Sequence, residues 1–100
     1  MKTFKTRTAD DLRKMIDYVK DKMTNTVVVL ASGADKAIFA AGVTKELTSK
    51  VKAGNLVKEA AVITGGNGGG RPDFAQAGGK DTTKIQEAMD AVREILRNSL

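Results

Sequence analysis

A chain of 100 residues, of which 41% are apolar and 29% charged, has the size and composition of one globular domain. It contains no cysteine and no histidine, which excludes disulfides, thiolate or imidazole catalysis, and zinc sites built from those ligands. The net charge of +5 favours a polyanionic partner such as nucleic acid, although the same charge also serves solubility. No apolar run approaches the roughly 20 residues that span a bilayer, so we expect a soluble domain without a membrane partner.

The N-terminal half predicts one helix followed by two strands. Residues 1–7 are compatible with a linker or with an edge strand. Thr8, followed by acidic residues, predicts a helix start, and apolar residues then recur at every third or fourth position as far as Met23. The apolar runs 26–31 and 37–43 predict two buried strands that pair as a hairpin.

The C-terminal half predicts two further helices with a strand between them. Residues 51–63 carry an apolar face, and Gly65 is placed to end that helix as a C-cap. Residues 73–78 predict a third strand. Thr83 with Gln86 three positions later is the pattern of a capping box, and helical periodicity then continues almost to the end of the chain.

Together these elements predict an α/β fold in a single domain that covers residues 1–100. We expect a small mixed β-sheet, made of the hairpin plus one parallel crossover strand, packed with about three helices. The crossover is expected because strand–helix–strand units, here residues 37–78, are nearly always right-handed with parallel strands. The chain ends at Leu100 without a cap, as expected for a domain that closes a longer protein.

Residues 65–80 contain seven of the ten glycines and the only proline of the chain. Glycine-rich loops present backbone amides to anions, but the nucleotide-binding fingerprints do not fit. Gly70 is followed by arginine and proline where a Walker loop needs lysine and a hydroxyl residue. The dinucleotide pattern, started at Gly66, needs a glycine at the position of Arg71. We therefore expect no mononucleotide site.

Two interpretations of this stretch remain open. In the first, the glycines admit a sugar–phosphate backbone and Arg71 offers a bidentate donor to a phosphate. The candidate RNA contacts are then Asn67, Gly68, Gly69, Gly70, Arg71, Gln76 and Lys80. In the second, the glycines only form a tight turn into the sheet, and Arg71 pairs with Asp73 or Asp81. Neither predicts catalysis or a metal site, because no nucleophile adjoins a base and no carboxylates are spaced to share a site.

Residues 66–79, GNGGGRPDFAQAGG, resemble the signature of the C-terminal domain of alanyl-tRNA synthetase. Residues 52–59 resemble the helix that precedes this signature, and residues 27–43 are similar to the two-strand segment of that family. The wider group, the DHH-associated domains, also binds substrate in phosphodiesterases and exonucleases. In those enzymes the position of Arg71 is typically histidine, so this sequence resembles the synthetase version.

The resemblance implies a non-catalytic tRNA-binding domain. In that family the domain holds tRNA near its elbow, so that aminoacylation and editing domains serve one molecule, and some members use this region in a homodimer. The parent would be a cytoplasmic alanine–tRNA ligase that uses ATP and magnesium, with zinc in its editing domain; this domain itself would bind no cofactor. By position, RNA contact is expected at the glycine–arginine signature. Lys50, Lys52 and Lys80 are weaker candidates, chosen on charge.

Two alternatives accompany this hypothesis. The substrate-binding domain of a DHH-type phosphodiesterase would prefer short single-stranded oligonucleotides to folded tRNA, and Arg71 counts against it. A structural or dimerisation module would bury the glycine stretch against a partner subunit and would have no affinity for RNA.

Overall fold

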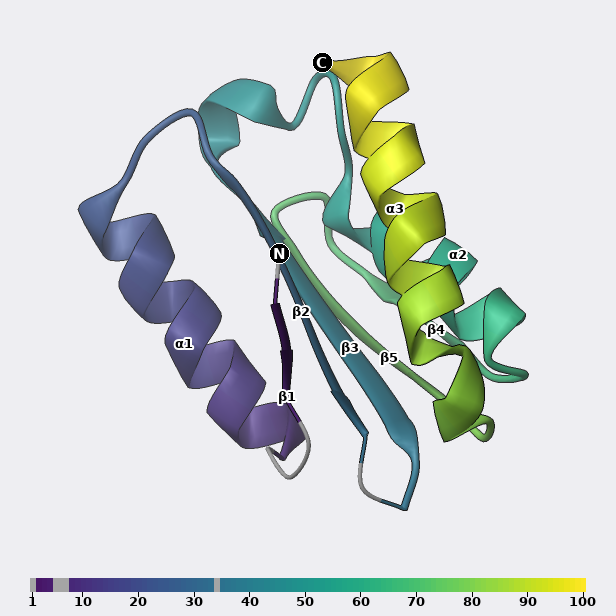
Figure 1. Cartoon of the computed structure of the whole chain (residues 1–100). Helices are drawn as coiled ribbons and strands as arrows, with labels where there is room; N and C mark the ends of the chain where they lie inside the picture. The colour runs from purple at the N-terminus through teal and green to yellow at the C-terminus, as the bar shows by residue number, and fades with distance from the viewer. Residues whose placement is uncertain (1, 5–7, 34) are drawn as a thin grey trace.

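The computed structural model describes residues 2–4, 8–33 and 35–100, which form a five-stranded sheet between one helix and a pair of helices (Figure 1). The strands are β1 (Lys2–Phe4), β2 (Val27–Gly33), β3 (Ala37–Val43), β4 (Asn67–Gly70) and β5 (Phe74–Gly79), in the spatial order β1-β2-β3-β5-β4. The helices are α1 (Ala9–Lys22), α2 (Ala53–Ile63) and α3 (Ile85–Ser99), with short 3-10 turns η1 (Lys45–Leu47) and η2 (Thr82–Lys84). Within these residues, no helix is both long and apolar enough for a membrane span.

The predicted α/β class, a mixed sheet packed with three helices, is confirmed for the described part of the chain. β1 pairs with β2 in parallel, while β2–β3, β3–β5 and β4–β5 are antiparallel pairs. Residues 2–4 thus form an edge strand, one of the two states that the sequence left open for residues 1–7; residues 1 and 5–7 lie outside the described residues.

The predicted parallel crossover onto the hairpin is wrong. β5, the neighbour of β3, runs antiparallel to it, with Ala37 opposite Gly79 and Gly42 opposite Phe74. The strand that runs parallel to β3 is β4, which follows α2, and β5 then returns as a hairpin between β4 and β3. The prediction fails because β4 has the sequence Asn-Gly-Gly-Gly, which carries no strand pattern and predicts a loop.

The start of α1 is as predicted, and α1 covers the β2–β3 side of one face of the sheet. The Thr8 hydroxyl accepts a hydrogen bond from the backbone N–H of Asp11 at 3.1 Å, and the Asp11 carboxylate accepts one from the N–H of Thr8 at 3.1 Å. Leu12 and Ile16 are fully buried beneath the helix. A Cβ at Gly42 would lie 2.3 Å from Ile16 Cγ2, so glycine there allows α1 to pack closely on β3.

The opposite face carries α2 and α3 and the larger core (Figure 1). Large buried side chains come from the sheet and both helices: Val29, Phe39, Val43, Leu56, Val57, Ile85, Met89 and Val92. α2 lies close to the sheet because small residues face it, and Gly54 in its first turn lies against the backbone of Gly70. The C-cap of α2 is Thr64, one residue before the predicted Gly65; Gly65 follows it with a φ of 76°, and the N–H of Gly66 donates to the carbonyl of Ala61 at 2.7 Å.

The predicted capping box of Thr83 and Gln86 is wrong. The carboxylate of Asp81 accepts hydrogen bonds from the backbone N–H of Thr83, at 2.9 Å, and from its hydroxyl group. Gln86 instead donates to Asp90 one turn further along α3. The two hydrogen bonds from Thr83 stabilise the carboxylate anion and lower the pKa of Asp81 below its ordinary value.

Candidate nucleic-acid interface

β4 is an edge strand, and most of its glycines are required by the close approach of β5. A Cβ at Gly66 would lie 1.8 Å from the carbonyl oxygen of Gly78, and one at Gly68 would lie 2.2 Å from the Cβ of Ala77. At Gly70 the nearest atom of β5 would be 2.8 Å away. Cβ atoms do not approach other atoms this closely, so these three positions are glycine for packing reasons.

Gly69 and Gly78 differ from these three. A Cβ at Gly69 would meet no described atom within 4 Å, and one at Gly78 would approach only the carbonyl oxygen of Ala37, at 3.3 Å. Packing therefore does not require glycine at Gly69 and requires at most a small shift at Gly78. Gly69 and Gly78 therefore add no side chain of their own to this face of β4 and β5, on which Gln76 lies opposite Gly69 and Asn67 lies opposite Gly78.

The turn between β4 and β5 carries Arg71 and borders a hollow of about 410 Å³, which we call the Arg71 hollow. The residues that line it are Gly69, Gly70, Arg71, Phe74, Ala75 and Gln76. The Arg71 side chain is 75% exposed, so a ligand in solution reaches its guanidinium group directly. Four of the predicted RNA contacts therefore lie around one hollow.

Arg71 pairs with Asp73, as the second interpretation of the sequence predicts. Arg71 Nε lies 3.5 Å from Asp73 Oδ1. The same carboxylate lies 3.6 Å from Nζ of Lys20 on α1, which also donates to the backbone carbonyl of Asp73 at 3.0 Å. One carboxylate thus faces two cations, which leaves an excess positive charge at this end of β4. An exposed pair contributes only about 0–1 kcal/mol, so an incoming phosphate competes readily with Asp73 for Arg71.

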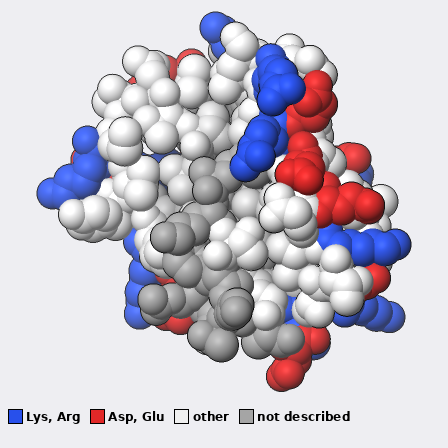
Figure 2. Space-filling model, viewed as in Figure 1, with Lys and Arg blue, Asp and Glu red and all other residues white. Residues whose placement is uncertain are grey.

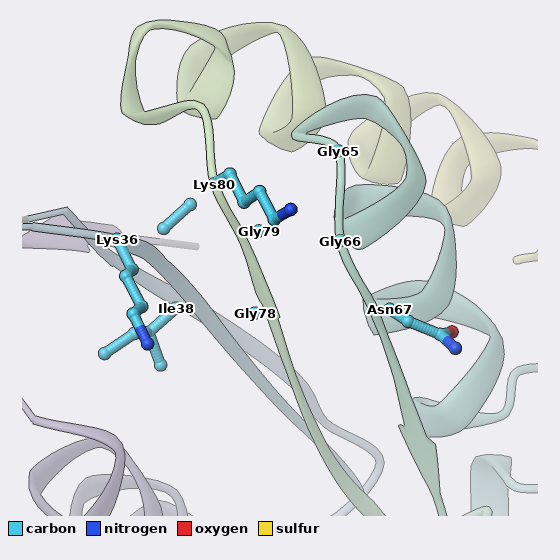
Figure 3. A pocket seen from close by; sticks show the side chains of 9 residues that line it. Lys36, Ile38, Gly65, Gly66, Asn67, Gly78, Gly79 and Lys80 are labelled. Carbon is cyan, nitrogen blue, oxygen red and sulfur yellow. The ribbon is translucent and has the colours of Figure 1, made fainter.

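A second hollow, of about 340 Å³, lies at the other end of β4, where β3 begins and β5 ends (Figure 3). We call it the Lys80 hollow; its lining is Lys36, Ala37, Ile38, Gly65, Gly66, Asn67, Gly78, Gly79 and Lys80. Figure 3 shows the Lys80 side chain extending toward the backbone of Gly65 and Gly66, with Lys36 on the other side of β5. Both lysines are exposed, and within the described part of the chain neither forms an ion pair.

The two predicted amide contacts, Asn67 and Gln76, already have partners in the structure. Asn67 Oδ1 accepts a hydrogen bond from the backbone N–H of Gly68 at 2.8 Å, and Figure 3 shows its side chain turned away from β5. Gln76 Nε2 donates to the carbonyl of Ala9 at 2.7 Å, which ties β5 to the start of α1. Both amides therefore stabilise the strands beside the hollows, and RNA contact through them would compete with these bonds.

Lys50 and Lys52 precede α2 and differ in their relation to Arg71. Lys52 immediately precedes Ala53, whose backbone N–H donates to the carbonyl of Pro72 at 2.9 Å, so Lys52 lies close to the β4–β5 turn. Its Nζ lies 3.5 Å from the carbonyl oxygen of Thr48. Lys50 is exposed and lines neither hollow, so the structure does not group it with the other candidates.

Lys20 and Lys36 are two basic residues near β4 that the sequence analysis did not identify. Lys36 lies in the β2–β3 turn and reaches the Lys80 hollow because Ala37 pairs with Gly79 in an antiparallel register. The hairpin prediction places Lys36 at a turn, but only the correct direction of β5 brings it beside Lys80. Lys20 belongs to the charged positions of α1 and shows no sequence signal that relates it to Asp73.

The charges on α3 are arranged differently from those around β4. Arg93 lies 3.9 Å from Asp90, and Arg97 lies 3.3 Å from Glu94. Figure 2 shows basic and acidic side chains side by side over this part of the surface. Because each arginine has an acidic neighbour on the same helix, α3 offers no excess of positive charge. Among the described residues there is also no group of three or more His, Cys, Asp or Glu that could hold a metal ion.

Comparison with known sequences gives a family and a set of close relatives. The family model of the DHHA1 domain matches residues 2–98. The chain is 59% identical over 97 residues to an alanine–tRNA ligase of Fusobacterium nucleatum, a match that covers 97% of this chain. It is 61% identical over 93 residues to an alanine–tRNA ligase of Alkaliphilus oremlandii, with 91% of this chain covered. Both matches cover 11% of the relative, so the chain spans about a tenth of the length of these ligases.

Comparison with solved structures identifies a similar isolated domain. The crystal structure of the C-Ala domain from Aquifex aeolicus alanyl-tRNA synthetase superposes with a TM-score of 0.85 at 38% identity. This match covers 94% of this chain and 86% of that domain. A DHH domain described as a member of the s1p family of ribosomal proteins has a TM-score of 0.58 at 14% identity over 82% of this chain and 19% of that one, and therefore shares the fold alone.

Proposed function

Because this chain belongs to the DHHA1 domain family and matches the C-Ala domain of an alanyl-tRNA synthetase over most of its length, we propose that it is the tRNA-binding domain of an alanine–tRNA ligase. In this proposal the domain catalyses nothing itself and holds tRNA for aminoacylation and editing by other domains of the parent. The parent's ATP, magnesium and editing-domain zinc sites, and its location in the cytoplasm, are part of the same proposal.

The observation that supports the proposal is the uncovered backbone of β4 between two basic ends. Arg71 stands at the β4–β5 turn, and Lys36 and Lys80 stand at the opposite end. Between them, Gly69 faces open space and Gly78 carries no side chain, which allows a ligand to approach the backbone closely at these two positions. A sugar–phosphate chain carries regularly spaced negative charges and needs this kind of close approach, so the surface suits an RNA backbone.

The aromatic residues favour recognition of the backbone and shape of RNA over stacking of its bases. Phe39 is fully buried in the core, and Phe74 is half-buried beneath the Arg71 hollow. Tyr18 is 66% exposed but lies on α1 and lines neither hollow. Sequence-specific RNA binding usually stacks unpaired bases on exposed aromatic rings, and among the described residues the only aromatic ring that lines either hollow is the half-buried Phe74.

The pairing of Arg71 with Asp73 supports a second candidate, a structural or dimerisation module. In that case Arg71 serves only to hold the β4–β5 turn, and the glycines serve only the packing of β4. This candidate explains Gly66, Gly68 and Gly70 by packing within the sheet, and it explains the open position at Gly69 only if a partner subunit covers that strand.

The proposed function is tested by tRNA binding over a range of salt concentrations, with the wild type, Arg71→Ala and Arg97→Ala. Arg71→Ala should weaken binding by roughly fivefold and reduce the slope of log K against log salt by about one. Arg97→Ala should change neither, because Arg97 is exposed but paired with Glu94 on α3. Circular dichroism checks that each variant is folded.

A folded wild-type chain that ignores tRNA at low salt would contradict the proposal. Preference for a short single-stranded oligonucleotide over tRNA would indicate the phosphodiesterase type of domain. A dimer in analytical ultracentrifugation, without RNA affinity, would support the second candidate.

A further inference from the structure

We propose that the Lys80 hollow binds a second phosphate of the same RNA strand whose backbone contacts Arg71. The proposal rests on the proposed function and adds to it the course of the strand. The RNA backbone runs along β4, from the β4–β5 turn to the place where β3 begins and β5 ends. Lys36 and Lys80 are the residues that contact this second phosphate.

The two ends of β4 are too far apart for one phosphate. Arg71 follows Asn67 by four residues, and an extended strand rises about 3.3 Å per residue, so these positions are about 13 Å apart. Arg71 lines the hollow at one end, and Asn67 lines the hollow at the other. One phosphate therefore cannot contact the cations at both ends, whereas two phosphates of a single strand that runs along β4 can.

The charge around the Lys80 hollow favours an anion. Lys36 reaches it from the β2–β3 turn and Lys80 from the end of β5, and neither lysine is paired with an acid among the described residues (Figure 3). Two carboxylates are near in sequence. Asp81 is engaged by both hydrogen bonds from Thr83, and Asp35 is an exposed turn residue. The hollow thus presents two ammonium groups that a phosphate can approach.

The floor of the hollow is backbone, but its amide groups are largely occupied. The N–H groups of Lys80 and Asp81 both donate to the carbonyl of Thr64 at 2.9 Å. An anion-binding nest of free amides is therefore not the basis of recognition at this end. The ammonium groups act as point charges, so binding is independent of base sequence and falls steeply with salt.

The test compares Lys36→Ala, Lys80→Ala and the double variant in salt-titrated tRNA binding. Each single variant should lower affinity by roughly threefold, and the double variant, which loses the contact to this one phosphate, should reduce the salt slope by about one. Lys80→Arg retains the charge and should bind as the wild type does. Lys58→Ala is the matched control, because Lys58 is an exposed lysine of α2 that lines neither hollow, and it should leave the affinity unchanged.

A double-mutant cycle between Arg71→Ala and Lys80→Ala tests whether the two ends bind separate phosphates. Additive losses are expected for separate contacts, whereas strong non-additivity would show one shared phosphate and overturn the proposal. The proposal also fails if the folded Lys36→Ala/Lys80→Ala variant binds tRNA as the wild type does. If Arg71→Ala nevertheless loses binding, the proposed function still holds and only the second phosphate site is excluded. A wild type that binds no tRNA would exclude both the proposed function and the second phosphate site.

Discussion

β4 and α3 are both exposed and both lie beside arginines, yet they present opposite surfaces. α3 buries an apolar face and carries three acidic residues with two arginines on its other side, each arginine within 4 Å of an acid. β4 has no charged side chain of its own, and the cations at its ends outnumber the carboxylates that pair with them. If the proposed function holds, the number of cations alone does not mark an RNA surface, and the distinguishing feature is unpaired positive charge beside accessible backbone.

The same contrast exists among the glycines around β4. Gly66, Gly68, Gly70 and Gly79 each face an atom that a Cβ would contact within 3 Å, so they serve the packing of the sheet. Gly69 faces open space. If the account is right, substitutions at the first group change stability, and substitution at Gly69 changes binding.

The largest effect is expected for Gly79→Ala. A Cβ there would lie 1.8 Å from Thr64 Oγ1, and Thr64 is buried and donates to the carbonyl of Ala60 at 3.1 Å. The free energy of unfolding in urea should fall by about 1–3 kcal/mol. Gly69→Ala is the control: it should leave stability unchanged or raise it by up to about 1 kcal/mol, because alanine restricts the unfolded chain. Equal losses of unfolding free energy for both variants would contradict the distinction between glycines that serve packing and the open position at Gly69.

An intermediate effect is expected for Asp73→Asn, which removes the carboxylate that faces Arg71 and Lys20. Since a phosphate no longer competes with this carboxylate, tRNA affinity at low salt should rise by roughly threefold. The free energy of unfolding should fall by less than about 1 kcal/mol. If Arg71 serves only the turn, Asp73→Asn will leave tRNA affinity unchanged, and a direct binding titration distinguishes the two results.

The smallest effect is expected for the pH dependence of stability in Asp81→Ala; Asp81 lies in the connection between β5 and α3. Hydrogen bonds from Thr83 hold the pKa of Asp81 below its ordinary value of 3.8 in the folded protein. A depressed folded pKa means that the ionised group stabilises the fold above its unfolded pKa and that this contribution is lost as pH falls through the folded pKa. The difference in urea midpoint between the wild type and Asp81→Ala should therefore shrink below pH 3.8. If the difference in urea midpoint does not change with pH, the charge of the Asp81 carboxylate does not contribute to stability.

The sequence predicts the helices and the β2–β3 hairpin well because these segments carry strong periodic patterns. Local cap chemistry alone identified Thr8 as the start of α1, and Gly65 located the end of α2 to within one residue of its C-cap, Thr64. β4 could not be predicted, because three successive glycines have no side chains with which to show a strand pattern. Gly68 and Gly70 are required because the β5 backbone lies close to them, and this tertiary contact cannot be read from the local sequence.

Because the direction of β5 was predicted wrongly, the sequence analysis also placed apart residues that the structure brings together. In a parallel crossover, Phe74 would lie near Ala37, and Lys80 would lie at the far end of the sheet from Lys36. The antiparallel register reverses this order and places Gly79 opposite Ala37. The sequence thus identified candidate residues, including the pairing of Arg71 with Asp73 as one of two interpretations, but it could not divide them between two hollows.

The most direct test of the account is tRNA binding by Gly69→Val. Valine fits an extended strand, and its side chain would project into space that is open among the described residues, so the urea midpoint should not fall. It would also keep an RNA backbone away from β4, and tRNA affinity should drop by about tenfold, or about 1.4 kcal/mol. A folded Gly69→Val variant that binds tRNA as tightly as the wild type would show that RNA does not approach this strand.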